Sequence, residues 1–458
     1  IKNVFFIAIL LSIVASVALA AEPSIPVSKA APLLDKVKSF SFSALPKGFQ
    51  EKGAPKLGSG VLLSVYIKGA VNAGVALDGS AVFIQEIGNI DANQMNHDAV
   101  SVFTGTVLNS GAEIGSGKVK SVERVGSIKA GGKASKSMVN VVVGNISSGT
   151  MGENSSSQIQ VGAVHGTKNV DREIINVAVG NILSGTLGNK DNSNINIATI
   201  SSSKNSMNRN MENIFVGDVS SSAAGKNSQS SIDVGSVVDS SNNKLAVIAG
   251  NLTQAAIGEN SDANLVVGQI SNSKNIKEEV EVANIISTAS GEQSNATNKV
   301  GVLSSVKQGI VGINVGTITT TAIDLKDTAT TKIGIDNNID NLTQGIFVGN
   351  VFTSASDVNS TATTEIGAIS NVNTVTQLIT AGVVSTSASG NGAVAKTVIG
   401  EIDGSSSVTQ NIAVGIVTTS SIGVDSTATT KVGSVLGGGA SRRQYSNGYY
   451  HKPCRGGF

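Results

Sequence analysis

The sequence predicts an all-β fold, a β-solenoid of about ten stacked coils, and three observations lead to this prediction. A short phrase recurs along the chain: an apolar residue, a glycine, any residue and a second apolar residue, as at residues 414–417 and 432–435. The phrases return in phase at a spacing of 33 residues over most of the chain. No proline occurs between Lys56 and Lys452, which suits a continuous ladder of paired strands because proline removes a ladder hydrogen bond.

Two columns of glycines mark the repeat, and their steps are 33 residues from Gly217 and Gly235 onwards and longer before them. The step from the first column to the second is longer than the step back, so the two halves of a repeat differ. One whole repeat of about 33–39 residues therefore forms one coil. The first column contains Gly144, Gly180, Gly217, Gly250, Gly316, Gly349, Gly382 and Gly415, with Ala283 in one place; the second contains Gly162, Gly235, Gly268, Gly301, Gly334, Gly367, Gly400 and Gly433, with Ala198 in one place.

Apolar residues lie three and one positions before each glycine and two positions after it, as Ile313, Val315 and Ile318 do around Gly316. The first pair has the two-residue period of a strand with one buried face, and the period breaks at the glycine. Glycine permits the backbone angles of a bulge or corner. We therefore expect two short strands per coil, each bent at its glycine with the same side facing inward.

A unit of this kind cannot bury its apolar side alone, so it must stack on copies of itself. Ankyrin and TPR repeats have a similar length, but they need helix-forming residues at helical spacing. The phrases here consist of Val, Ile and Gly, and the segments between them are rich in Ser, Thr and Asn. This composition favours strands joined by turns.

The chain divides into four parts. Residues 1–20 have the pattern of a signal peptide, with Ala18, Ala20 and Ala21 forming an A-x-A cleavage site, so we expect secretion and membrane contact only during export. Residues 21–59 contain five of the six prolines and form either a cap on the first coil or an unstructured leader. Residues 60–436 form the solenoid, and residues 437–458 form a flexible tail rich in Gly, Tyr and Arg.

In the last coils Gln344, Gln377 and Gln410 are 33 residues apart, which predicts a column of stacked amides that hydrogen-bond along the stack. Asparagine follows the first-column position in several coils, and two explanations are open: a second amide column or the ordinary preference of asparagine for turns. These asparagines are Asn145, Asn181, Asn251, Asn284 and Asn350.

Composition argues against several functions. The formal charge is +1, so the chain lacks the excess of basic residues that nucleic-acid binding needs. Aromatic residues make up 3% of the chain, too few to line a typical small-molecule pocket. The histidines lack companions at metal-ligand spacing, and Cys454 has no second cysteine with which to form a disulfide. Asp324 and Asp357 align one repeat apart, but Gly390 and Gly423 follow them. We therefore expect no enzyme activity, no metal, no cofactor and no catalytic residue.

Threonine pairs of the form T-x-T occupy matching positions in three coils, at residues 328–330, 361–363 and 427–429. Flat ladders of this kind resemble those of ice-binding proteins. Val394 and Lys396 interrupt the ladder, and threonine is a favoured residue on exposed strands in any case. Ice binding is therefore a third alternative.

The secretion signal and the proline-free repeats rich in Gly, Asn, Gln and Ser resemble bacterial secreted fibre proteins of the curlin-like functional amyloid class. The resemblance covers residues 60–435 in composition and does not include the fixed spacing of curlin repeats. It implies a secreted structural protein that associates with itself into extracellular filaments or matrix. We expect its β-coils to stack end to end or side by side, because the open ends of a solenoid are unpaired strand edges. The alternative is a cell-surface adhesin or passenger stalk that presents its tail or a loop to a partner.

Overall fold

The computed structural model describes residues 62–436, apart from short gaps at 78–79, 93–94, 97–98, 115–117, 131–132, 136–137, 163, 168, 172–173, 203–206, 209–210, 239 and 242–243. The predicted signal peptide, the leader and the tail lie outside the described residues. Within them every regular element is a β-strand, so no helix able to cross a membrane is found there.

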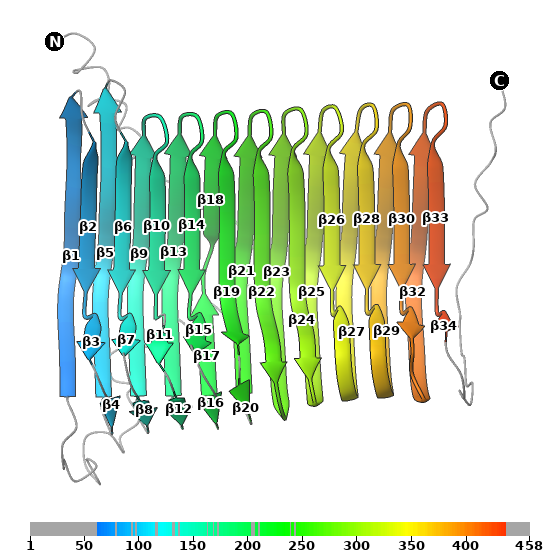
Figure 1. The fold of residues 1–458 in the computed structure, drawn as a ribbon, viewed down its shortest axis with the longest axis horizontal. Helices are drawn as coiled ribbons and strands as arrows, with labels where there is room; N and C mark the ends of the chain where they lie inside the picture. Colours follow the sequence, from blue (N-terminus) through cyan, green and yellow to red (C-terminus); the bar gives the residue numbers. More distant parts are fainter. Residues whose placement is uncertain are drawn as a thin grey trace. The chain divides into compact units, whose positions relative to one another are not determined.

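The described part is a β-solenoid of parallel stacked coils, which confirms the predicted fold class (Figure 1). Each coil has an outgoing strand, a tight turn and a return strand. Asn140 and Asn176 occupy equivalent places in two early coils and are 36 residues apart. Gln344 and Gln377 do so in two late coils and are 33 residues apart. One repeat is therefore one coil, as the unequal halves of the repeat predicted.

The outgoing strands are long. Most of those up to β21 have 14 or 16 residues, and the longest later ones have 21. Most of them pass through the first glycine column without a break, so the short first strand predicted for each coil is longer than expected. The outgoing strands are β1 (Leu62–Leu77), β5 (Ala99–Ile114), β9 (Met138–Met151), β13 (Ile174–Leu187), the pair β17 (Met211–Val216) and β18 (Val219–Ala224), β21 (Lys244–Ile257), β23 (Ile276–Ser290), β25 (Gln308–Ile323), β27 (Asp336–Ser356), β29 (Ile369–Ser389) and β32 (Ser407–Ile422).

The return strands run back to a corner at the second glycine column, and a short strand follows the corner in several coils. The return strands are β2 (Ala81–Ile87), β6 (Val119–Val125), β10 (Ser156–Val161), β14 (Asn192–Ile197), β19 (Gln229–Val238), β22 (Asp262–Ser273), β24 (Asn295–Val306), β26 (Thr328–Ile333), β28 (Thr361–Ile366), β30 (Val394–Ile399) and β33 (Thr427–Val432). The short strands after the corner are β3 (Ile90–Ala92), β7 (Ile128–Ala130), β11 (Val164–Thr167), β15 (Ile200–Ser202), β31 (Ile402–Asp403) and β34 (Val435–Leu436).

The early coils are longer because they carry one more short strand. These strands form a separate five-stranded sheet, which ends where the repeat shortens to its final length. Its members are β4 (Met95–Asn96), β8 (Lys133–Ser135), β12 (Asn169–Asp171), β16 (Met207–Asn208) and β20 (Ser240–Ser241).

The core of a coil tapers towards the tight turn. In the coil formed by β27 and β28, Val351 and Ile366 fill the wide part and Ala355 and Ala362 the narrow tip, all at most 2% exposed. Alanines gather into separate clusters at this tip, because the outgoing and return strands approach too closely there for larger side chains. Valine, isoleucine and leucine form the large core cluster of the wide part.

Candidate functional site

The glycines of the first column allow successive coils to approach each other closely. A Cβ on Gly180 would lie 2.1 Å from the carbonyl oxygen of Gly144 in the preceding coil, and one on Gly349 would lie 2.3 Å from that of Gly316. Two consecutive residues face outward at this point, as Gly144 and Asn145 do between the buried Val143 and Ile146. This is the predicted break in the strand period, with the same side facing inward before and after it.

The glycines of the second column have a different role, because they turn the chain. Gly162, Gly268 and Gly367 have φ angles of +62°, +63° and +61°, in the left-handed region that side chains rarely adopt. Ala198 occupies the same position with φ +47°. The two columns thus use glycine for two physical reasons: close approach in the first and backbone conformation in the second.

A third column, which the sequence analysis missed, forms the tight turns between outgoing and return strands. Gly258 and Gly291 open two of these turns with φ +132° and +129°, and Asp324 and Asp357 open the next two with φ +135° and +92°. The alignment of the two aspartates therefore reflects a turn position that usually holds glycine. Their spacing of 33 residues from each other was the available signal.

The three predicted glutamines lie one above the other inside the solenoid. Nε2 of Gln377 donates to Oε1 of Gln344 at 2.7 Å, and Nε2 of Gln410 donates to Oε1 of Gln377 at 2.8 Å. Each Nε2 also donates to the carbonyl oxygen of the corner glycine in its own coil, at 2.7 to 3.0 Å. The column therefore ties the strands of each coil to its corner and each coil to the next.

Two buried glutamates belong to the same column, further towards the N-terminus. The strand register aligns Glu212, Leu245, Glu278, Val311 and Gln344 in successive coils. Glu212 and Glu278 are each 1% exposed. Burial raises the pKa of Glu212 well above its ordinary value, and burial together with the charge of Asp336 does the same to the pKa of Glu278. Burial therefore favours the neutral form of both carboxyl groups, which is close in shape to the amide of the glutamines they align with.

Asp336 is a third buried acid in this region. It occupies a position that holds isoleucine in the following coils, at Ile369 and Ile402. Its carboxyl group accepts hydrogen bonds from Nε2 of Gln344 at 2.6 Å and from the backbone N–H of Leu303 at 3.2 Å. Burial raises the pKa of Asp336 to about 8.

Hydroxyl groups, most of them buried and joined in one place by the amide of Asn298, form two hydrogen-bonded chains through the tapered half of the core, alternating between outgoing and return strands. In the second chain Thr331 and Thr353 are 2.9 Å apart, and Thr364 donates to Thr353 at 2.8 Å. The first chain contains Ser121, Ser148, Ser157, Ser184, Ser193, Ser221 and Ser230. The second contains Ser287, Asn298, Thr320, Thr331, Thr353, Thr364, Thr386, Thr397, Thr419 and Thr430.

The asparagines after the first glycine column lie on the outside of the coils. Nδ2 of Asn284 donates to Oδ1 of Asn251 at 2.8 Å, and the backbone N–H of Asn181 donates to Oδ1 of Asn145 at 3.2 Å. All five asparagines lie inside outgoing strands, so the position supports contacts along the stack and not a turn. A second asparagine ladder, which the sequence analysis missed, has side-chain bonds of 2.9 Å and joins Asn140, Asn176 and Asn213.

The predicted T-x-T pairs lie on the outer side of the return strands. Thr328 pairs with Thr361, and Val394 and Lys396 interrupt the ladder before Thr427. Charges follow on the same side of these strands, where Lys332 and Lys396 contact Glu365 at 3.3 and 3.4 Å.

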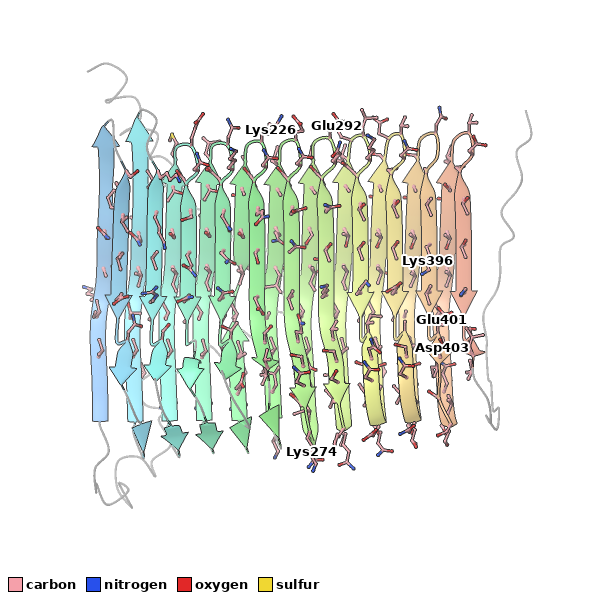
Figure 2. All side chains as sticks on the ribbon, viewed as in Figure 1. Lys226, Lys274, Glu292, Lys396, Glu401 and Asp403 are labelled. Atoms are coloured by element: carbon pink, nitrogen blue, oxygen red, sulfur yellow. The ribbon has the colours of Figure 1, made fainter. Side chains whose placement is uncertain are left out.

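The outer side of the outgoing strands from β9 onwards is different, because these strands carry no ionisable side chain between the asparagine position and the tight turns. Asp218 takes the asparagine position in one coil and therefore lies just outside this surface. We call the surface the neutral face. Charges gather instead at the edges of the coils, as Lys226 and Glu292 do at the turns and Lys274 does at the opposite edge (Figure 2). The neutral face is formed by residues 146–151, 182–187, 219–224, 252–257, 285–290, 318–323, 351–356, 384–389 and 417–422.

In the first described coil Lys68 takes the place that glycine holds in the first column of later coils. A Cβ on Gly105 would lie 2.0 Å from the carbonyl oxygen of Lys68, so Lys68 holds the first-column position one coil earlier. Every later coil has glycine or Ala283 there, because a side chain would meet the carbonyl of the coil before it. Among the described strands β1 pairs only with β5, and Lys68 is exposed at this edge.

These features define a scaffold of the β-solenoid class. Among the described residues no group of three or more His, Cys, Asp and Glu side chains could hold a metal ion. No family model, curated protein or solved structure matches the chain.

Proposed function

We propose that this chain is a secreted structural repeat protein that associates with itself into extracellular filaments or matrix. The observation that carries the proposal is the neutral face, which repeats along the stack without a charge. Natural sheets usually protect exposed surfaces from self-association with charged side chains. Secretion is inferred from residues 1–20, which lie outside the described residues.

Lys68 bears on whether solenoids associate end to end or side by side. Addition of another coil in register would place the Lys68 side chain against a carbonyl oxygen, as the short distances at the column glycines indicate. A charged side chain at a sheet edge is a known means of preventing edge-to-edge pairing. Side-by-side association of solenoids therefore agrees with the structure better than end-to-end stacking in register.

The same lysine supports the second candidate, an adhesin or passenger stalk. A solenoid whose edge resists further coils can serve as a spacer of fixed length that presents another segment to a partner. Ice binding ranks third, because Val394 and Lys396 interrupt the threonine ladder and Lys332 and Glu365 lie beside it.

The test is electron microscopy of the purified chain over a range of concentrations, with fibre diffraction on any ordered assembly. Filaments or sheets with a repeat of about 4.7–4.8 Å between strands and about 10 Å between packed sheets would support the structural role. Single solenoids that never associate at any concentration would contradict it and favour the stalk.

A further inference from the structure

We propose that the neutral face is the contact surface between two copies of this chain, packed face to face with their stacks running in opposite directions. This inference rests on the proposed self-association and names the surface that joins two copies into a pair. It follows from the sizes of the outward side chains, the lack of charge and the area of the face.

Large and small side chains alternate along one column of the neutral face. In four successive coils the column holds Ile286, Thr319, Phe352 and Ser385. Ile286 and Phe352 are each 41% exposed, so they project from the sheet, and the smaller Thr319 and Ser385 leave depressions beside them. The column therefore has projections and depressions at a regular spacing of one coil.

A two-fold axis parallel to the strands, between the coils of Thr319 and Phe352, makes this column complementary to itself. The rotation reverses the direction of the stack and keeps each column opposite its own copy. Ile286 then faces Ser385 of the second copy, and Phe352 faces Thr319. A large side chain meets a small one at all four positions, as an isologous interface requires.

A second column near the turns obeys the same symmetry in these coils. It holds Ser290, Ile323, Ser356 and Ser389. The axis places the 45% exposed Ile323 opposite Ser356 of the second copy, and Ser290 opposite Ser389. Two columns with unrelated residues are thus compatible with the same axis.

The charge distribution agrees with a partner of the same kind. The neutral face offers no ionic group to an acidic or basic ligand, whereas its hydroxyl, methyl and apolar groups can pack against an identical surface. The nearest charges of these coils, Glu292, Asp324, Lys326 and Asp357, belong to exposed turns. They would lie at the rim of the interface, where polar residues are usual and water screens their charge.

The overlap of the two faces is large enough for a specific contact. The axis pairs the six segments from 252–257 to 417–422 with those of the second copy, and at its two ends Ile257 meets Ile422, both exposed apolar side chains. Six strands at about 4.8 Å, each about six residues long at about 3.4 Å per residue, give about 600 Å² from each copy. The total of about 1,200 Å² reaches the lower limit of the standard range for protein interfaces. Face-to-face packing of two sheets at about 10 Å is also a common arrangement.

The experiment places charges on the neutral face. In the proposed dimer Thr321 faces Ser354 of the second copy, so the double variant Thr321→Lys with Ser354→Lys brings like charges together at the centre of the interface. The matched control is Thr330→Lys with Thr363→Lys, which adds the same charges to the outer side of return strands β26 and β28. Circular dichroism and the melting temperature establish that both variants fold.

Sedimentation of the full chain measures association. We expect the neutral-face variant to raise the dissociation constant at least tenfold and the control variant to change it less than twofold. Mixing the lysine variant with a variant carrying Thr321→Asp and Ser354→Asp should restore dimers, since opposite charges then meet across the interface.

Two results would overturn the inference. If the unsubstituted chain associates and the neutral-face lysines leave association unchanged, copies meet through another surface, and the proposed structural function stands without this interface. If the unsubstituted chain stays monomeric at every concentration, both the interface and the structural function are wrong.

Discussion

Gln377 and Gln344, one coil apart, are joined by a hydrogen bond of 2.7 Å from Nε2 of Gln377 to Oε1 of Gln344 inside the core. The same Nε2 also donates to the carbonyl oxygen of Gly367 at 2.8 Å. Each side chain in this column therefore connects three segments of backbone: its own strand, its own corner and the neighbouring coil. Removing one member leaves buried polar groups without partners in two coils.

Replacing Gln377 by leucine should lower the free energy of unfolding by about 1–3 kcal/mol, because the carbonyl of Gly367 and Oε1 of Gln344 lose their donor in a buried place. Urea titration measures the change. The control is Thr376→Leu, an exposed neighbour on β29, which should change stability by no more than about 0.5 kcal/mol. Equal losses in both variants would show that the amide column has no special role.

The buried acids should make the solenoid less stable as pH rises. The pKa of Glu278 is raised in the folded chain, and burial raises the pKa of Glu123 to about 8. Below about pH 4, the ordinary range of a carboxyl group, folded and unfolded chains are both protonated and the stabilisation is fully present. As pH rises towards 8 the unfolded chain loses protons that the folded chain retains, so the free energy of unfolding falls.

Glu278→Gln tests this pH dependence, since the variant supplies the amide that the column already uses at Gln344. We expect a flatter dependence of the melting temperature on pH between about 4 and 8 and greater stability than the unsubstituted chain at pH 8. Glu281→Gln, an exposed change on the same strand, should leave the pH profile unaltered. A profile for Glu278→Gln identical to that of the unsubstituted chain would contradict the raised pKa of Glu278.

Two glycines on β27 should respond oppositely to alanine. A Cβ on Gly349 would lie 2.3 Å from the carbonyl oxygen of Gly316, whereas one on Gly345 would meet nothing closer than 3.8 Å. Gly349→Ala should therefore destabilise the chain by about 1–3 kcal/mol through overpacking. Gly345→Ala should stabilise it by about 0.4–1 kcal/mol, since alanine restricts the unfolded chain. Urea midpoints distinguish the two, and a loss of similar size at both positions would refute the close-approach explanation.

Thr364 and Thr363 are adjacent in sequence and lie on opposite sides of β28. Thr364→Val removes a hydroxyl from the buried chain that joins Thr353 and Thr386, so we expect a loss of about 1–2 kcal/mol in the free energy of unfolding. Thr363→Val changes an outward side chain and should alter stability by about 0.5 kcal/mol at most. Thermal unfolding of both variants checks the difference, and the reverse order would mean that the inward and outward sides are wrongly assigned.

Lys68→Gly should allow coils of separate molecules to pair at the edge formed by β1. With no side chain at this position, an incoming carbonyl can approach as it does at Gly349 and the other column glycines. Electron microscopy should then show particles longer than those of the unsubstituted chain. Lys120→Gly removes an equal charge from β6, away from this edge, and should leave particle length unchanged; elongation in both variants would point to net charge instead.

The sequence predicted the solenoid, the coil length and the inward side of each strand, because those depend on a period that the glycines interrupt at fixed points. The glutamine column followed from a constant spacing of 33 residues. Glu278 lies two coils before Gln344 in the same column, but the ordinary charge of a glutamate argues against burial there. Only its buried surroundings, which raise its pKa, explain how this side chain fits there.

The buried hydroxyl chain and the neutral face could be recognised only from the strand register in the structure. The two threonines of each T-x-T pair face outward. The threonine that follows the pair, such as Thr331, faces inward and belongs to the buried hydroxyl chain. The neutral face consists of residues from segments that look like ordinary polar connections in the sequence. Their common side becomes visible only when the bulge at the first glycine column fixes which residues point outward.

The parallel stacking also determines how the chain would carry a mechanical load. The hydrogen bonds between coils run along the stacking direction, so a pull on the two ends of the repeat region loads the bonds of one terminal coil at a time instead of shearing many together. Coils would detach singly, and each late coil would release about 110 Å of extended chain. Unzipping of this kind would lengthen the chain in steps of one coil.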